Sequence, residues 1–317
     1  MAKHDFLHAG MRAARRKHWD RAERYFGLAI DDAERSGDRG VVTSCHFWLG
    51  LIALWRGSYD DADAAFETAL AAAEEEDNRR TAAMILSYRG AVARDREDWD
   101  TADRWFRQAV ALAGDAGDHL RVVSCLVDLG QMASERGLFD DAEAWFRKAL
   151  DATEQHGDRA DLALSFHRLG VLALQRDDLD NAEEWLRTSV HLSETLDDSS
   201  IHAMCLEHLG QVVHRKERPY EAMVLLVRAV TGAGPTVDTG WLWYTIARLA
   251  EEAGPDAPGA AWREVTGRRL PPAVRARLRV AHLRLRWPWR PLGEATAAVR
   301  RVWRAHLVAG RWPKRRG

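Results

Sequence analysis

Cysteine and proline are scarce in this chain, with three cysteines and nine prolines among 317 residues. Cys45, Cys125 and Cys205 are evenly spaced along the sequence, and no Cys-x-x-Cys pair is present. That pattern argues against a zinc or redox site. A disulfide needs Cα atoms within about 7 Å, which equivalent positions two repeats apart do not provide. The three cysteines are therefore predicted to be small, buried hydrophobic residues.

Long apolar runs are also missing. No stretch approaches the roughly 20 apolar residues of a membrane span. The N-terminal sequence MAKHDFLHAGMRAARRKHW lacks the apolar core of a secretory signal. We therefore expect no membrane span and a cytoplasmic location. With 46% hydrophobic and 30% charged residues, the chain can still bury a substantial core.

Motifs that mark catalytic sites are absent as well. The sequence has no Gly-x-Gly-x-x-Gly, no phosphate-binding loop, no His-Glu-x-x-His and no Gly-x-Ser-x-Gly. His208 and His214 are close in sequence, with His202 and Glu207 beside them, but a spacing of six does not place two side chains on one helix face. We therefore predict no enzyme activity, no cofactor and no metal site.

The net charge of −2 conceals a strong asymmetry. Residues 241–317 hold 17 Lys and Arg against 5 Asp and Glu, whereas the preceding residues hold 29 against 43. Within 268–317 there are 15 basic residues and a single acidic one, Glu294. An acidic body followed by a basic segment is typical of a protein whose end contacts something anionic.

What the chain does contain is a sequence repeat in six copies. Each copy has a glycine, an alanine twelve positions later and a large apolar residue four beyond that. The glycines are Gly10, Gly50, Gly90, Gly130, Gly170 and Gly210. The alanines are Ala22, Ala62, Ala102, Ala142, Ala182 and Ala222, and the large residues are Phe26, Phe66, Phe106, Phe146, Leu186 and Leu226. A 40-residue period of this kind indicates a stacked array.

Apolar spacings of three and four predict two helices in each copy. In the first five copies an acid precedes the recurring alanine by two positions and is predicted to cap the second helix. These acids are Asp20, Asp60, Asp100, Asp140 and Asp180. The glycine falls inside the first helix, where it is costly, so we expect a close backbone approach there with the recurring alanine as the matching contact. Gly37, Gly117 and Gly157 are predicted helix C-caps.

This pattern resembles the tetratricopeptide repeat (TPR) family over about residues 5–232. Leu129, Gly130, Ala142, Phe146 and Ala149 of the fourth copy carry the resemblance. The common TPR unit is shorter, at about 34 residues, and often ends in proline. Here the region between copies is longer and that proline is missing. Long-period arrays in regulators of high-GC bacteria are similar, and 41 arginines against 5 lysines fit such a source.

The resemblance implies an all-α fold, a right-handed superhelical α-solenoid of stacked antiparallel helix pairs with a C-terminal helical cap. We expect six repeats over 1–235, a degenerate seventh over 236–267 and a basic, Arg- and Trp-rich helical segment over 268–317. Trp105, Trp145 and Trp185 occupy one repeat position and are predicted to pack between repeats; a ladder of rings for a ligand is the alternative.

In this family the first helices line a concave groove that binds a partner protein or peptide, and no catalysis is implied. The positions three before, one after and four after each glycine resemble groove-lining ones. They are Phe47, Leu51, Leu54, Ser87, Ala91, Arg94, Val127, Gln131, Ser134, His167, Val171, Leu174, Glu207, Gln211 and His214. The Asn and Lys set that clamps a C-terminal carboxylate in some TPR domains is missing. An extended peptide or helix held by apolar groups and Gln hydrogen bonds fits better. Alternatively, several of these side chains pack under the C-terminal segment.

Residues His167 and Glu207 share one repeat position, and a polar contact in the groove is expected for them. Neither a specific partner nor an oligomeric state is indicated by the sequence.

The basic segment supports a second hypothesis, a nucleic-acid-associated regulator that neutralises phosphates. Its arginines include Arg275, Arg277, Arg279, Arg284 and Arg286. Tryptophans that could stack on bases are interleaved with them: Trp287, Trp289, Trp303 and Trp312. An apolar stripe runs along the same segment, formed by Val274, Leu278, Ala281 and Leu285. The stripe predicts that the segment docks on the end of the repeats, and a solvated segment is the alternative.

Overall fold

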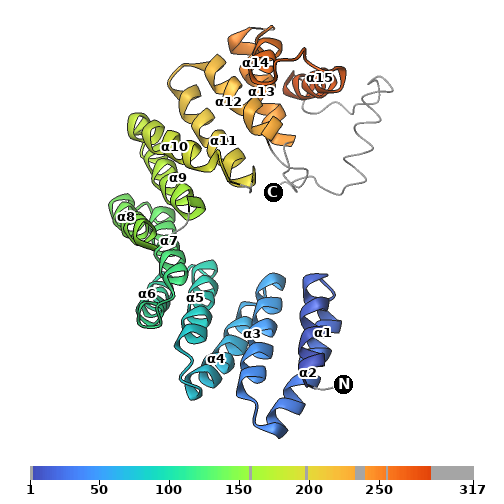
Figure 1. Cartoon of the computed structure of the whole chain (residues 1–317), viewed down its shortest axis with the longest axis vertical. Helices are drawn as coiled ribbons and strands as arrows, with labels where there is room; N and C mark the ends of the chain where they lie inside the picture. Colours follow the sequence, from blue (N-terminus) through green and yellow to red (C-terminus); the bar gives the residue numbers. More distant parts are fainter. Residues whose placement is uncertain (1–2, 157–158, 197–198, 233–239, 255, 287–317) are drawn as a thin grey trace. The chain divides into compact units, whose positions relative to one another are not determined.

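A computed structural model describes residues 3–156, 159–196, 199–232, 240–254 and 256–286. The regular secondary structure within these ranges is entirely α-helical (Figure 1). The chain divides into two compact units, Met1–Asp158 and Arg159–Gly317. Each unit is a stack of helix pairs, and each is described by itself.

The first unit holds four helix pairs, in which an odd-numbered first helix packs against the even-numbered helix that follows. The helices are α1 (Lys3–Arg15), α2 (Trp19–Ser36), α3 (Arg39–Arg56), α4 (Tyr59–Glu75), α5 (Arg79–Asp95), α6 (Trp99–Asp115), α7 (His119–Glu135) and α8 (Phe139–His156). Within this unit, α2, α4 and α6 each also pack against the first helix of the next pair. This arrangement is the predicted α-solenoid of stacked pairs.

The second unit continues the pattern and then departs from it. Its helices are α9 (Arg159–Gln175), α10 (Leu179–Ser193), α11 (Ser199–Arg215), α12 (Pro219–Gly232), α13 (Gly240–Ala253), α14 (Ala257–Thr266) and α15 (Pro272–Arg286). After the pairs α9–α10 and α11–α12, α14 packs on α12, and α15 packs on α13 (Figure 1). The segment assigned to a degenerate seventh repeat forms α13 and α14, and the proposed domain boundaries stay a prediction.

The recurring glycine makes room for the recurring large side chain. A Cβ atom on Gly50 would lie 2.6 Å from the ring of Phe66, and one on Gly130 would lie 2.6 Å from the ring of Phe146. Phe66 is completely buried in the core between α3 and α4. The expected close approach is therefore present, and the nearest atoms at Gly50 and Gly130 belong to the phenylalanine ring; at Gly210 the backbone oxygen of Ala222 also lies 3.5 Å from the Cβ position.

Helix starts differ from the expectation by two positions. Asp98 and Asp178 are the N-caps of α6 and α10, and their side chains accept hydrogen bonds from the backbone N–H groups of Thr101 and Asn181. The acids predicted as caps lie inside the first turn instead, because the apolar residue before each one is already helical. The acids that were wrongly predicted as N-caps and lie in the first turn are Asp20, Asp60, Asp100, Asp140 and Asp180. Negative charge still favours the positive end of a helix there.

First helices are capped in the same way by an Asp or Asn just before them. The side chains of Asp38, Asn78 and Asp118 accept hydrogen bonds from the backbone N–H groups three positions on. At the other end of α2, Gly37 is the C-cap with φ of 70°, as predicted. Gly117, with φ of 64°, follows the C-cap Ala116 of α6 by one position, and Gly157 lies outside the described residues.

All three cysteines are fully buried and free. Burial raises the pKa of the Cys45 and Cys125 thiols to about 12 and also raises the pKa of Cys205. Thiols held protonated in the core act as hydrophobic groups, so the prediction for the cysteines is confirmed.

The repeated tryptophans pack within and between helix pairs. The guanidinium of Arg89 lies 4.6 Å from the ring centroid of Trp105, and that of Arg107 on α6 lies 4.7 Å from the ring of Trp145 on α8. The ring of Trp185 stacks on Phe166 at 5.6 Å. All three indoles are partly buried, so the packing role is confirmed.

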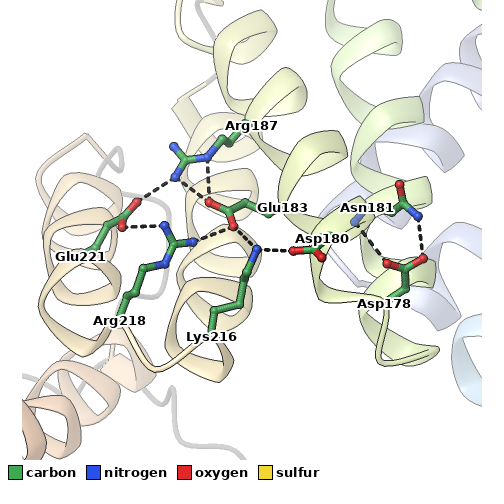
Figure 2. Close-up of polar contacts among 8 residues, drawn as sticks. All are labelled: Asp178, Asp180, Asn181, Glu183, Arg187, Lys216, Arg218 and Glu221. Carbon is green, nitrogen blue, oxygen red and sulfur yellow. Dashed lines mark hydrogen bonds and ion pairs between the residues drawn. The ribbon is translucent and has the colours of Figure 1, made fainter.

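An ion-pair network joins α10 to the turn between α11 and α12 (Figure 2). Glu183 accepts hydrogen bonds from Arg187 at 2.7 Å and Lys216 at 2.8 Å, and Arg218 lies 2.6 Å away. Arg187 also donates to Glu221 at 2.8 Å. Burial disfavours the charge on Glu183, but the hydrogen bonds from Arg218, Lys216 and Arg187 outweigh it and lower the pKa of Glu183 to about 2. The network thus ties two helix pairs together.

The substitution Glu183→Gln should lower the free energy of unfolding by about 1–3 kcal/mol at pH 7, because three cations lose one shared carboxylate. Asp103→Asn is the matched control: Asp103 holds the same repeat position, and its one ion pair within the described part of the chain is with Arg107, so its loss should cost under about 1 kcal/mol. Because the pKa of Glu183 is lowered, its contribution is complete above pH 4.5 and disappears as the pH falls towards 2. Thermal unfolding at several pH values tests this, and equal effects of the two variants would contradict it.

Candidate functional site

The predicted groove positions fall into three rows along the first helices, and the rows have different environments. The row three positions before the glycine contacts the next first helix. Phe47 on α3 packs its ring 5.1 Å from that of Tyr88 on α5, and Ser87 on α5 accepts a hydrogen bond from Arg121 on α7 at 3.1 Å. Ser87 and His167 of this row are buried. At Phe47, Ser87 and His167 this row therefore joins neighbouring first helices, whereas Val127 and Glu207 of the row are partly exposed.

The row four positions after the glycine also reaches the next first helix, through ion pairs. The guanidinium of Arg94 on α5 lies 3.5 Å from Asp128 on α7. Nε2 of His214 on α11 lies 2.8 Å from Glu252 on α13. Leu54, Ser134 and the remaining members of the row are partly exposed, so this row flanks the open surface.

The row one position after the glycine contains Gln211, the one exposed residue among the predicted groove positions. Leu51 is buried, but Ala91, Gln131 and Val171 are partly exposed, and Gln211 is exposed. The amide groups in this row bond within their own helix. Gln131 donates to Glu135 at 3.0 Å, and Gln211 donates to Glu207 at 3.2 Å. We call these positions the glycine-plus-one row of each unit: Ala91 and Gln131 in the first unit, and Val171 and Gln211 in the second.

Burial raises the pKa of Glu207 to about 7, and the hydrogen bond from Gln211 opposes that shift only in part. A partly buried carboxylic acid next to Gln211 thus lies at the edge of the glycine-plus-one row on α11. Near neutral pH this group is close to half protonated, so it can act as either a donor or an acceptor toward a partner.

His167 on α9 and His208 on α11 form a pair in which His167 is buried and His208 is partly buried. Nε2 of His167 lies 3.1 Å from Nδ1 of His208, and that Nδ1 is also 3.1 Å from the carbonyl oxygen of Met204. The two rings meet edge to face at 4.7 Å. The expected polar contact of His167 is therefore with His208 and not with Glu207. Their spacing in the sequence, one period plus one position, was the signal that could have revealed the pair.

Nδ1 of His167 is buried and has no hydrogen-bond partner among the residues that the structure describes. Burial, followed by the nearby His208 and the positive charge of Arg168, lowers the pKa of His167 to about 3. Burial also lowers the pKa of His208. Both rings are therefore neutral at physiological pH. Within the part of the chain that the structure describes, no three His, Cys, Asp or Glu side chains are placed to bind a metal ion together.

The described part of the basic segment docks on the second unit. Val274 and Leu278 of α15 pack against its core, and Ala281 is buried. The docking prediction is confirmed for these three residues. Arg275, Arg277 and Arg279 are exposed. The side chains of Arg284, Leu285 and Arg286 lie outside the described set, as do residues 287–317 with Trp287, Trp289, Trp303 and Trp312.

Stacked helix pairs with a 40-residue period and a partly open first-helix row define a TPR-type repeat array. Residues 29–236 match the family described as the MalT-like TPR region, and the chain belongs to that family. No curated protein matches it. No helix among the described residues has the length and apolar character needed to cross a membrane.

Solved structures similar to this chain share its fold. RapI in its apo form has a TM-score of 0.63 at 12% identity, over 92% of this chain and 80% of RapI. BtubC from P. vanneervenii has a TM-score of 0.57 at 19% identity, over 73% of this chain and 91% of BtubC. NprR in complex with its cognate peptide NprX has a TM-score of 0.51 at 12% identity, over 97% of this chain and 87% of NprR.

Proposed function

We propose that this chain is a non-catalytic regulatory adaptor whose first helices bind a peptide or a segment of another protein along the glycine-plus-one row of a single unit. The observation that carries the proposal is the contrast between the two sets of helices. On the second helices, charged side chains pair along the surface at one repeated position. These pairs are Arg107 with Asp103 at 2.6 Å, Arg147 with Glu143 at 2.9 Å and Arg187 with Glu183 at 2.7 Å.

The first helices present a different surface. Ala91 and Val171 offer small apolar contacts, and Gln131 and Gln211 offer amide groups that both donate and accept hydrogen bonds. A peptide backbone carries the complementary donor and acceptor at every residue. An extended or helical segment can therefore bury apolar side chains here while its polar groups find partners. The structure of NprR with its cognate peptide supports peptide binding as a use of this fold.

The test is selection of a random peptide library on the purified chain, followed by calorimetry with the recovered peptides. Gln131→Arg and Gln211→Arg should each weaken binding by about tenfold or more, since each places a long cation in the proposed contact row. Gln108→Arg is the matched control, because Gln108 is an exposed glutamine on a second helix, α6, and it should leave affinity unchanged. Peptides that bind all three variants as tightly as the original chain would contradict the proposal.

A further inference from the structure

The arginines of the repeats and those of α15 differ in how they are paired. In the repeats, Arg56 lies 2.7 Å from Asp20, Arg89 donates to Asp63 at 2.8 Å, and Arg96 lies 2.6 Å from Asp60. By contrast, Arg275, Arg277 and Arg279 are exposed, and their guanidinium groups make no ion pair or hydrogen bond with any residue that the structure describes. The repeats neutralise many of their own cations, whereas α15 does not.

Two further arginines precede α15 in the sequence. Arg268 and Arg269 are also exposed. Residues 268–279 contain five arginines and no acidic residue. We propose that this surface, Arg268, Arg269, Arg275, Arg277 and Arg279, binds the phosphate backbone of nucleic acid without reading its sequence. This site is separate from the glycine-plus-one row and does not depend on the function proposed for it.

Helix geometry places these cations on both sides of the packed stripe. At about 100° per residue, Arg275 and Arg279 project on one side of α15, and Arg277 projects on the other. Arg275 and Arg279 are separated by about 6 Å along the helix axis, and phosphates recur every ~3.4 Å along a strand, so long side chains can reach separate phosphates. Guanidinium groups also match phosphate oxygens with two parallel hydrogen bonds.

The packing of α15 favours nucleic acid over an anionic membrane as the partner. A helix that binds a bilayer surface must bury its apolar side in the lipid. The apolar side of α15 is already occupied, because Val274 and Leu278 pack against the core of the second unit and Ala281 is buried. What remains outside is a cationic surface in which the described apolar residues between the arginines, Ala273, Ala276 and Val280, have small side chains. Such a surface suits a partner that offers closely spaced anions and needs no apolar insertion.

The experiment is fluorescence anisotropy of the full chain with a labelled DNA duplex of mixed sequence. The triple substitution R275Q/R277Q/R279Q is compared with R21Q/R24Q/R104Q, which removes three exposed arginines from the repeats. At about 50 mM salt, the α15 variant should bind the duplex at least about tenfold more weakly, and its plot of log K against log salt should be shallower by up to about 2.7. The repeat variant should behave as the unmodified chain, and circular dichroism should give both variants the same unfolding temperature.

Vesicles of phosphatidylserine and polyglutamate serve as the other anionic probes. Binding of the duplex that depends on the α15 arginines, and is tighter than binding of vesicles or polyglutamate, supports the proposal. Equal loss of duplex binding in both variants would overturn it, since net charge would then explain the effect. Stronger arginine-dependent binding to vesicles or polyglutamate than to the duplex would also overturn it and assign the surface to a lipid or a protein.

Discussion

Gly130→Leu is expected to lower the free energy of unfolding by about 2–4 kcal/mol, the largest effect foreseen for a single change in the first unit. A Cβ atom at this position would lie 2.6 Å from Cδ1 and from Cε1 of Phe146. Phe146 is buried with 4% of its surface exposed, so its ring cannot move without shifting α7 away from α8. Thermal unfolding followed by circular dichroism measures the effect.

The same substitution at Gly27 is the control. Gly27 also lies inside a helix, α2, but a Cβ atom there would meet nothing within 4 Å. Gly27→Leu should therefore raise stability by roughly 0.5–1 kcal/mol through helix propensity alone. The milder substitutions Gly130→Ala and Gly210→Ala should also differ in their effect on the unfolding temperature. A Cβ atom on Gly210 would lie 3.1 Å from the nearest side-chain atom, compared with 2.6 Å for one on Gly130. If Gly130→Leu and Gly27→Leu unfold at the same temperature, the role assigned to the glycine is wrong.

Acid is expected to destabilise the second unit through His167. In the unfolded chain this ring binds a proton below about pH 6.5, whereas burial, His208 and Arg168 lower its pKa in the folded chain to about 3. Its contribution to stability is therefore complete above pH 6.5 and declines as the pH falls towards 3. Between pH 7 and pH 5 the loss should be about 2 kcal/mol.

The variant His167→Gln isolates this contribution. Glu207 changes stability in the opposite direction over the same range, because its raised pKa makes the folded chain bind protons more tightly than the unfolded one. The pH dependence of the free energy of unfolding of the original chain therefore does not isolate His167. The difference in that pH dependence between the original chain and a His167 variant does. His167→Gln should largely escape the loss of stability between pH 7 and pH 5 that the original chain suffers through this ring. His191→Gln, at an exposed position, should lose as much as the original chain. An unchanged pH dependence in His167→Gln would refute this account.

The repeat made the fold predictable from sequence. A glycine and a phenylalanine that recur at fixed offsets require each other in space, because the ring fills the volume that a side chain on Gly50 or Gly130 would occupy. The sequence did not show which residue contacts the glycine, because the alanine lies one helical turn from the phenylalanine and is also buried. Cap positions were displaced because the apolar residue before Asp100 joins the helix.

The sequence predicted that the first helices form the candidate surface, but it did not predict which of their side chains are exposed. Whether a first-helix side chain is open depends on what the next repeat places against it. Ser87 is covered because Arg121 reaches it, and His167 is covered because His208 lies one position beyond the equivalent residue. These neighbours do not follow the 40-residue period, so no pattern within one repeat reveals them. Gln131 and Gln211 remain open because their amides bond along their own helices.

The most direct measurement of the central claim is photo-crosslinking with a library-selected peptide that carries a photoreactive amino acid, followed by mass spectrometry of the adducts. The account predicts that the crosslinks map to first helices, on or beside the glycine-plus-one row of α5, α7, α9 and α11, and that unlabelled peptide suppresses them. Crosslinks concentrated on the charged outer surface of second helices such as α6 and α10, with the first helices unlabelled, would contradict it.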